Sequence, residues 1–240
     1  MRSKAVSVLS TAFIFASASA VDAQISNVTM LPSRFTFGGD FAISQPKGEF
    51  ASNVPNGYGL DVTGMFRLDP KGWFNIRVDG GGVQYGHEHQ SIGFAGSGRV
   101  TLDLNTNNRI GFGAIGLQVQ FPDGWFRPYG NASIAAMDFS TESCVSAPDN
   151  SIEPLCHNNA SDWSHAGIFG GGVLVPFGNS IGSLNLGARY HYGARATYLR
   201  KGDIIDNPDG TVTLNLRQSK TDLVLWQVGV SFAIPRSTTQ

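Results

Sequence analysis

The segment that most constrains the fold is residues 184–195, LNLGARYHYGAR, in which apolar and polar side chains alternate. A β-strand has a side-chain period of two, so this segment has one apolar and one polar face. In a water-soluble sheet the apolar face would cover a core. In a membrane-spanning barrel the apolar face would meet lipid and the polar face would line the lumen. The segment alone does not decide between these two arrangements, so the rest of the chain has to.

Strand-like stretches recur along the whole chain after its N-terminal part. We expect eight strands, at residues 34–44, 58–68, 73–86, 110–121, 126–139, 165–177, 184–199 and 222–234. The connections alternate between long ones (45–56, 87–109, 140–164, 200–221) and short turns (69–72, 122–125, 178–183). Long loops therefore share one end of the molecule and short turns the other, as in bacterial outer-membrane barrels.

The N-terminus has the pattern of a secretory signal peptide. Arg2 and Lys4 precede an apolar stretch at 5–16, and small residues follow, with cleavage expected before Gln24 and a second possible site after Ala20. This gives a signal peptide at 1–23, a short N-terminal segment at 24–33, a barrel at 34–234 and a C-terminal tail at 235–240. The mature protein is therefore expected to be exported.

Composition agrees with a barrel and argues against several other classes. Charged residues make up 15% of the chain, against roughly 25% in soluble domains. A net charge of −1 gives no electrostatic basis for binding nucleic acid. Beyond the N-terminus there is no apolar run of about 20 residues, so we expect no transmembrane helix. Aromatic residues near the short turns are expected to form a girdle at the membrane interface: Phe66, Trp73, Phe74, Phe121, Trp125, Phe126, Phe177 and Phe232.

Four stretches resemble segments of the bacterial outer-membrane beta-barrel domain family, the small eight-stranded OmpA-like barrels. They are Arg127-Pro128-Tyr129-Gly130, Leu186-Gly187-Ala188-Arg189-Tyr190, YLRKGD at 198–203 and VGVSF at 228–232. The resemblance covers nearly all of the chain from Arg34. It implies an all-β, eight-stranded antiparallel up-and-down transmembrane β-barrel in the bacterial outer membrane, and implies little about activity. One departure is that such barrels commonly end on an aromatic residue, whereas Phe232 is followed by eight more residues.

The polar parity of the expected strands supplies charged residues to the lumen. These are Asp40, Asp61, Arg67, Arg77, Asp79, Arg189, His191 and Arg195, with Asn75, Gln118, Gln120, Asn131 and Asn185 between them. Eight strands enclose a space just wide enough for side chains, and buried charges are costly unless they are paired. We therefore expect a polar network that closes the lumen to general diffusion, with a narrow pore as the competing interpretation.

Other candidate sites are weaker. Cys144 and Cys156 are the only cysteines and lie in one polar loop of an exported chain, so we expect them to form a disulfide. His87 and His89 share a face, but no third and fourth metal ligand is identified, and we expect no metal site. Ser164 and His165 are adjacent, but no carboxylate is evident to orient the histidine, so we expect neither catalysis nor a cofactor.

The expected function is non-enzymatic: a structural or surface-interaction role for a monomeric outer-membrane barrel, through its long extracellular loops. Its expected partners are outer-membrane lipid and lipopolysaccharide, together with an unidentified extracellular partner of the loops, and no nucleic acid. The alternative is a small lipid- or ligand-handling barrel, which could be an outer-membrane enzyme, or a narrow channel.

Overall fold

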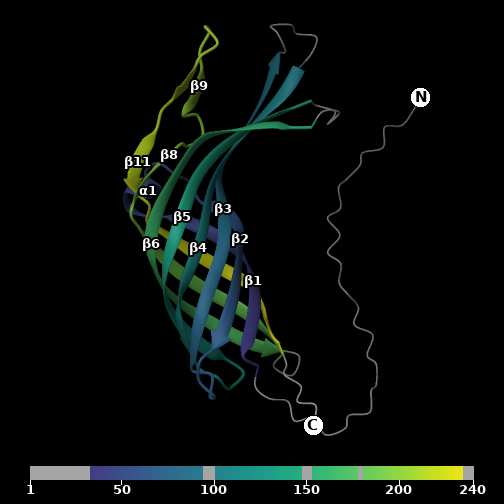
Figure 1. The fold of residues 1–240 in the computed structure, drawn as a ribbon, viewed down its shortest axis with the longest axis vertical. Helices are drawn as coiled ribbons and strands as arrows, with labels where there is room; N and C mark the ends of the chain where they lie inside the picture. Colours follow the sequence, from purple (N-terminus) through teal and green to yellow (C-terminus); the bar gives the residue numbers. More distant parts are fainter. Residues whose placement is uncertain (1–32, 94–100, 148–152, 178–180, 235–240) are drawn as a thin grey trace, which may run out of the picture.

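Eight strands close into an antiparallel barrel, in the order β1-β12-β7-β6-β5-β4-β3-β2 (Figure 1). The computed structural model describes residues 33–93, 101–147, 153–177 and 181–234; the expected signal peptide at 1–23, nearly all of the segment at 24–33 and the tail at 235–240 lie outside this range. The barrel strands are β1 Phe35–Pro46, β2 Gly57–Arg67, β3 Phe74–Gly93, β4 Thr101–Gln120, β5 Arg127–Ser146, β6 Leu155–Phe177, β7 Gly182–Gly193 and β12 Leu223–Ala233. The predicted fold class, an up-and-down barrel, is confirmed.

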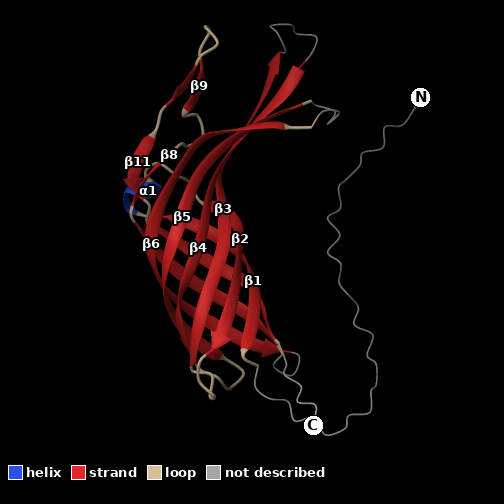
Figure 2. Cartoon of the chain, in the orientation of Figure 1, coloured by secondary structure: helices blue, strands red, loops and turns tan. Residues whose placement is uncertain are grey.

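Short elements occupy the end of the barrel that carries the long connections. A four-residue helix, α1 (Gly48–Ala51), lies between β1 and β2, and four short strands lie between β7 and β12: β8 Arg195–Tyr198, β9 Ile204–Asp206, β10 Val212–Leu214 and β11 Arg217–Lys220. Figure 2 shows this helix beside the short strands, in a chain otherwise built of strands. Within the described residues, no helix has the length and apolar character needed to cross a membrane.

The barrel turns its apolar faces outward. In β7 the side chains of Leu184 and Leu186 are exposed, whereas Asn185 and Arg189 are buried in the lumen. The other barrel strands follow the same rule, and their exposed residues include Phe37, Phe41, Leu60, Val62, Val78, Ile115, Leu117, Ile134, Phe169, Trp226, Val228 and Val230. Exposing such a surface to water is unfavourable, because each Å² of apolar area that is removed from water stabilises a protein by about 25 cal/mol. The alternation at 184–195 therefore has its apolar face on the outside of the barrel.

Aromatic side chains meet in pairs at the end with the short turns, which we call the short-turn end. Four pairs have ring centroids between 4.9 and 6.2 Å apart: Phe35–Phe66, Trp73–Phe121, Trp125–Phe126 and Phe177–Phe232. The four pairs lie at different places around the barrel, and in three of them the two rings come from different strands or turns; Trp125 and Phe126 are neighbours in the turn before β5. This arrangement matches the geometry expected of an aromatic girdle.

Two of the predicted long loops are largely strand. β3 and β4 stay paired from Gln84↔Arg109 to Gly93↔Thr101, and β5 and β6 stay paired to Val145↔Leu155. These extensions stand beyond the barrel at its other end, the long-loop end (Figure 1). Prediction failed here because much of each extension, such as HEHQS at 87–91 and NTNNR at 105–109, is polar on both parities and lacks the alternation that marks a half-buried strand. The alternating piece at 100–104 predicts only an extended arm of the loop.

The predicted seventh strand at 184–199 is broken. β7 ends at Gly193, and the backbone N–H of Ala194 donates to the carbonyl of His165 at 2.9 Å. A Cβ on Gly193 would lie 2.2 Å from Oγ1 of Thr221, so the chain passes very close to the segment before β12 at this point. Beyond the break, β8 leaves the barrel and pairs with β11 instead. The predicted loops at 45–56 and 200–221 likewise contain α1 and β9 to β11.

Candidate functional site in the barrel lumen

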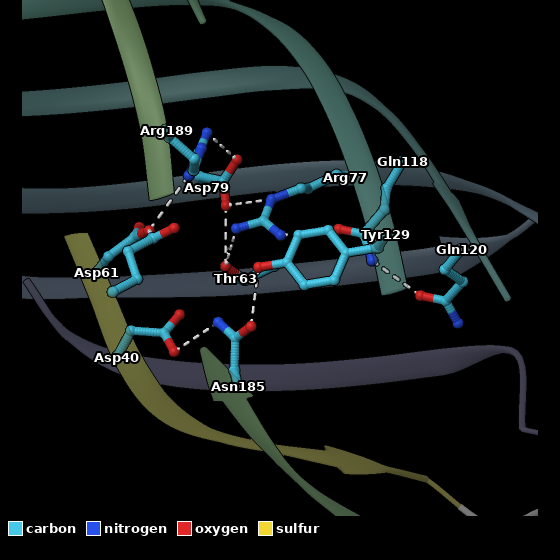
Figure 3. A network of polar contacts seen from close by, with 11 residues as sticks. Asp40, Asp61, Thr63, Arg77, Asp79, Gln118, Gln120, Tyr129, Asn185 and Arg189 are labelled. Atoms are coloured by element: carbon cyan, nitrogen blue, oxygen red, sulfur yellow. Dashed lines mark hydrogen bonds and ion pairs between the residues drawn. The ribbon is translucent and has the colours of Figure 1, made fainter. Parts of the chain in front are cut away.

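The strand register brings charged side chains to one level of the lumen. Asp40 of β1 lies opposite Asp61 of β2, and Thr63 of β2 lies opposite Asp79 of β3. All four point inward because they share the parity that faces away from the apolar exterior, and all are at most 6% exposed. Arg189 reaches this group from β7, on another part of the barrel wall (Figure 3).

Arg189 is the central cation of the lumen. Its Nη1 lies 3.2 Å from Oδ2 of Asp61, and its Nη2 lies 2.8 Å from Oδ2 of Asp79, with all three side chains fully buried. A planar guanidinium suits this role because its fork can serve two carboxylates at once. The side chain therefore ties β7 to β2 and β3 across the lumen.

Arg77 forms the second half of the charged layer. Its Nε donates to Oδ1 of Asp79 at 2.8 Å, its Nη1 to Oε1 of Gln118 at 2.8 Å, and its Nη2 to Oγ1 of Thr63 at 3.0 Å. The Thr63 hydroxyl in turn donates to Asp79 at 2.8 Å. Asp79 thus receives both guanidinium groups, and Gln118 carries the network on to Gln120 at 2.8 Å.

A neutral arm completes the network on the side of β12 and β7. The hydroxyl of Tyr129 donates to Oδ1 of Asn185 at 2.8 Å, and Nδ2 of Asn185 donates to Oδ1 of Asp40 at 2.8 Å. Gln227 of β12 donates to Oδ2 of Asp61. Among the described residues Asp40 has no cationic partner. The layer therefore holds three carboxylates and two guanidinium groups, a formal charge of −1 when all are ionised.

Glycines on the inner face leave room for the two largest members. A Cβ on Gly170 would lie 2.8 Å from Cγ of Arg189. A Cβ on Gly172 or Gly187 would lie 2.6 or 2.5 Å from the Tyr129 hydroxyl. The backbone of β7 is closer still, at 2.3 Å from the position of either Cβ on Gly170 or Gly172, so close approach of backbone and side chains accounts for both glycines.

An apolar cluster fills the lumen toward the long-loop end. Phe50 of α1 is fully buried, and its ring packs edge-on to Tyr198 at 5.2 Å, Phe139 at 6.0 Å and Tyr85 at 6.4 Å. The carbonyl of Leu199 accepts hydrogen bonds from the Tyr85 hydroxyl at 2.8 Å and from Asn108 at 2.9 Å. Sequence analysis missed this cluster, which we call the apolar cap. The one usable signal was Phe50, a large apolar residue within an otherwise polar loop.

The structure separates the eight residues predicted for the lumen network. Asp40, Asp61, Arg77, Asp79 and Arg189 lie together. Three other residues do not join them. His191 is buried between this layer and the apolar cap, with its ring edge-on to Phe112 at 5.4 Å. Arg67 lies at the short-turn end, where its guanidinium contacts Gly72. The prediction is wrong for Arg195, which is 54% exposed in β8 and pairs with Glu49 at 3.4 Å, because the strand break turns it out of the lumen.

The other candidate residues lie outside the charged layer. His87 and His89 each place Nδ1 2.9 Å from an asparagine Oδ1 of β4. Ser164 faces the interior and His165 the exterior, as neighbours in a strand must, so they do not form a pair. Cys144 and Cys156 are paired residues of β5 and β6 and form the predicted disulfide near the tip of that hairpin. Glu142 lies close to the two sulfurs, but these are already bonded to each other.

An ion-paired loop closes over the long-loop end. Asp203 is 3% exposed and accepts hydrogen bonds from the side chains of Arg200 and Arg217, each at 3.2 Å. Burial alone would raise the pKa of Asp203, but the hydrogen bonds from Arg217 and Arg200 outweigh it and hold the pKa below its ordinary value of 3.8. The carboxylate therefore stays ionised and fixes the segment that carries Leu199.

Fold and lumen together define a class: a closed up-and-down β-barrel with an apolar exterior and an interior filled by side chains.

No protein-family model matches the chain, and neither does any curated protein sequence. Solved structures of similar fold include Ail, the attachment invasion locus protein of Yersinia pestis, with 10% identity, 85% of this chain and 99% of that chain covered and a TM-score of 0.44. Neisserial surface protein A has 13% identity, 84% and 98% covered and a TM-score of 0.43. A major outer membrane protein from Thermus thermophilus has 12% identity, 83% and 99% covered and a TM-score of 0.43.

Proposed function

We propose that this chain is a bacterial outer-membrane barrel that is closed to solutes and presents a polar surface outside the cell. The observation that carries the proposal is the orientation of the barrel wall: exposed leucine, valine and phenylalanine outside, buried aspartate and arginine inside. Soluble monomers rarely expose contiguous apolar patches larger than a few hundred Å², whereas lipid requires such an exterior. The proposed location is therefore the outer membrane, with lipid and lipopolysaccharide around the barrel.

Two filled layers support a non-conducting role. The charged layer and the apolar cap occupy successive levels of the lumen, and the cavity beside Asp40, Arg77 and Tyr129 measures about 10 Å³, roughly the space of one water molecule. A solute would have to displace both layers to cross. A structural or surface-interaction role needs no such passage, and the monomeric state proposed here needs no partner strand to close the wall.

The extended β3–β4 and β5–β6 hairpins are the surface proposed to meet an extracellular partner. They project beyond the barrel (Figure 1). The disulfide between Cys144 and Cys156 holds one of them near its tip. Their side chains form cross-strand polar contacts such as Thr106 Oγ1 to Ser143 Oγ at 2.7 Å. A paired, largely polar sheet of this kind suits recognition of a solvated partner.

Three sets of measurements test the proposal. The folded protein should remain with outer membranes after a salt wash and migrate on a denaturing gel differently before and after heating; recovery in the soluble fraction with no shift would refute a membrane barrel. An epitope inserted at Asn207 should be detected on intact cells, and a matched epitope at Asp123 only after permeabilisation. In planar bilayers the purified protein should give no sustained conductance, and reproducible ion-selective steps would favour the channel instead.

A further inference from the structure

A second cavity opens at the short-turn end, below the charged layer. It has a volume of about 390 Å³ and is lined by side chains of the barrel mouth. We call it the lower vestibule. The β2 end, the β2–β3 turn and the start of β5 contribute Arg67, Lys71 and Arg127, whereas the neighbouring strands β1, β12 and β7 contribute the hydroxyl groups of Thr36, Ser231 and Ser183.

The lower vestibule is rich in groups that donate hydrogen bonds to anions. Among its described lining residues three are cationic and one, Asp123, is a carboxylate. The nearby Asp69 is not part of the lining. Its oxygens accept hydrogen bonds from the backbone N–H of Gly72 at 2.9 Å and of Phe74 at 2.7 Å. The hydrogen bond from Phe74, with further ones from the same turn, lowers the pKa of Asp69 and keeps the carboxylate engaged there.

Local backbone structure positions one of these cations. Gly72 has φ +84°, which a residue with a side chain rarely adopts, and a Cβ at this position would lie 3.0 Å from Arg67 Cζ. The turn therefore lets the guanidinium lie against its backbone at the mouth. Gln120, which also lines the vestibule, connects this level to Arg77 through Gln118.

We propose that the lower vestibule binds a phosphate group, carried either by inorganic phosphate or by a small phosphate ester. Guanidinium and ammonium groups form strong, charge-assisted hydrogen bonds with phosphate oxygens, and hydroxyl groups can satisfy the remaining oxygens. The volume falls within the range of small-molecule sites. The proposed function would place the short-turn end, and with it this site, on the periplasmic side of the membrane. The phosphate site itself does not rest on that function.

Calorimetric titration of the purified, folded, full-length protein in neutral detergent tests the proposal. Inorganic phosphate and glycerol 3-phosphate are the two probes, and chloride at matched ionic strength is the reference. Saturable binding of either probe is expected; tighter binding of the ester than of the free ion would identify phosphate esters as the source, and tighter binding of the free ion would identify inorganic phosphate. No saturable binding of either probe would overturn the proposal.

Variants at the mouth locate the binding. We expect Arg67→Gln and Lys71→Gln each to weaken phosphate binding at least tenfold, Arg67→Lys to retain part of it, and Lys201→Gln, at the long-loop end, to leave it unchanged. Binding as strong as that of the native protein in both glutamine variants would overturn the assignment. The heat-dependent gel shift, recorded in parallel, reports the fold, so loss of phosphate binding with an intact shift would leave the barrel proposal standing. Should Arg67→Gln fail to fold, the exposed Lys71 still provides the test.

Discussion

Replacing Arg189 should have a large effect on stability, because this side chain neutralises two buried carboxylates. Arg189→Met keeps most of the length of the side chain and removes its charge. Asp61 then loses its cation and Asp79 keeps only Arg77. The formal charge of the layer changes from −1, for three Asp and two Arg, to −2, for three Asp and one Arg.

The expected magnitude follows from the burial of these groups. Removing one partner of a buried ion pair typically costs about 3–5 kcal/mol, whereas an exposed pair contributes about 0–1 kcal/mol. Arg195→Met is the matched control, since Arg195 is 54% exposed and pairs with a Glu49 that is equally exposed. Arg189→Met should therefore lower the free energy of unfolding by about 3 kcal/mol or more, and Arg195→Met by less than about 1 kcal/mol.

The assay is urea-induced unfolding of the protein in lipid vesicles, followed by tryptophan fluorescence and by the heat-dependent gel shift. Adding Asp61→Asn to Arg189→Met should recover part of the loss, because it removes one uncompensated carboxylate. If Arg189→Met unfolds at the same urea concentration as Arg195→Met, the charged layer does not stabilise the barrel and the reasoning is wrong. Full additivity of the two substitutions would show that Arg189 and Asp61 are not coupled.

Three further predictions concern the lumen, the loop and the disulfide. Asp40→Asn should leave stability unchanged or raise it, since Asp40 accepts from Asn185 and has no cation partner in the described structure, whereas Asp79→Asn should lower it; urea unfolding compares the two. Asp203→Asn should speed hydrogen exchange around Leu199 at pH 7, and the difference from the native protein should vanish at low pH: the pKa of Asp203 lies below 3.8, so its contribution is present above that value and is lost as the pH falls through the folded-state pKa. Thiol labelling of the denatured, unreduced protein should detect no free cysteine, and Cys144→Ser with Cys156→Ser should keep the gel shift, because the bridge lies in the hairpin beyond the barrel.

The barrel itself was predictable because an apolar exterior and a packed polar lumen impose a period of two on the sequence. Phe37, Phe41 and Val228 alternate with polar neighbours, and the turn at Asp69-Pro70-Lys71-Gly72 has the expected composition. The lengths of β3 to β6 were not predictable in this way. Residues such as Asn105 and Asn107 lie in the extensions, where strand pairing depends on the partner strand rather than on a pattern within one segment.

The charged layer was predictable in membership but not in position. Parity tells which face a side chain occupies, whereas its level depends on register between strands. Arg67 shares the parity of Asp61 and Thr63 in its strand but lies at the mouth, and Arg195 follows a break that its sequence does not mark. The apolar cap could not be predicted for a different reason. It forms because α1 folds into the lumen, and such a tertiary contact leaves no periodic pattern in the local sequence.

The two layers differ in chemistry, so we expect the proposed closure of the lumen to survive the loss of either one. If the charged layer were disrupted, Phe50 and its aromatic neighbours would still fill the next level of the lumen. Arg189→Met should thus be less stable and still fail to conduct. Phe50→Ala removes the centre of the cap and leaves the charged layer intact, so it should also fail to conduct. Only the double variant is expected to give conductance steps in a planar bilayer. Steps in a single variant would show that the layer left intact does not seal the barrel by itself.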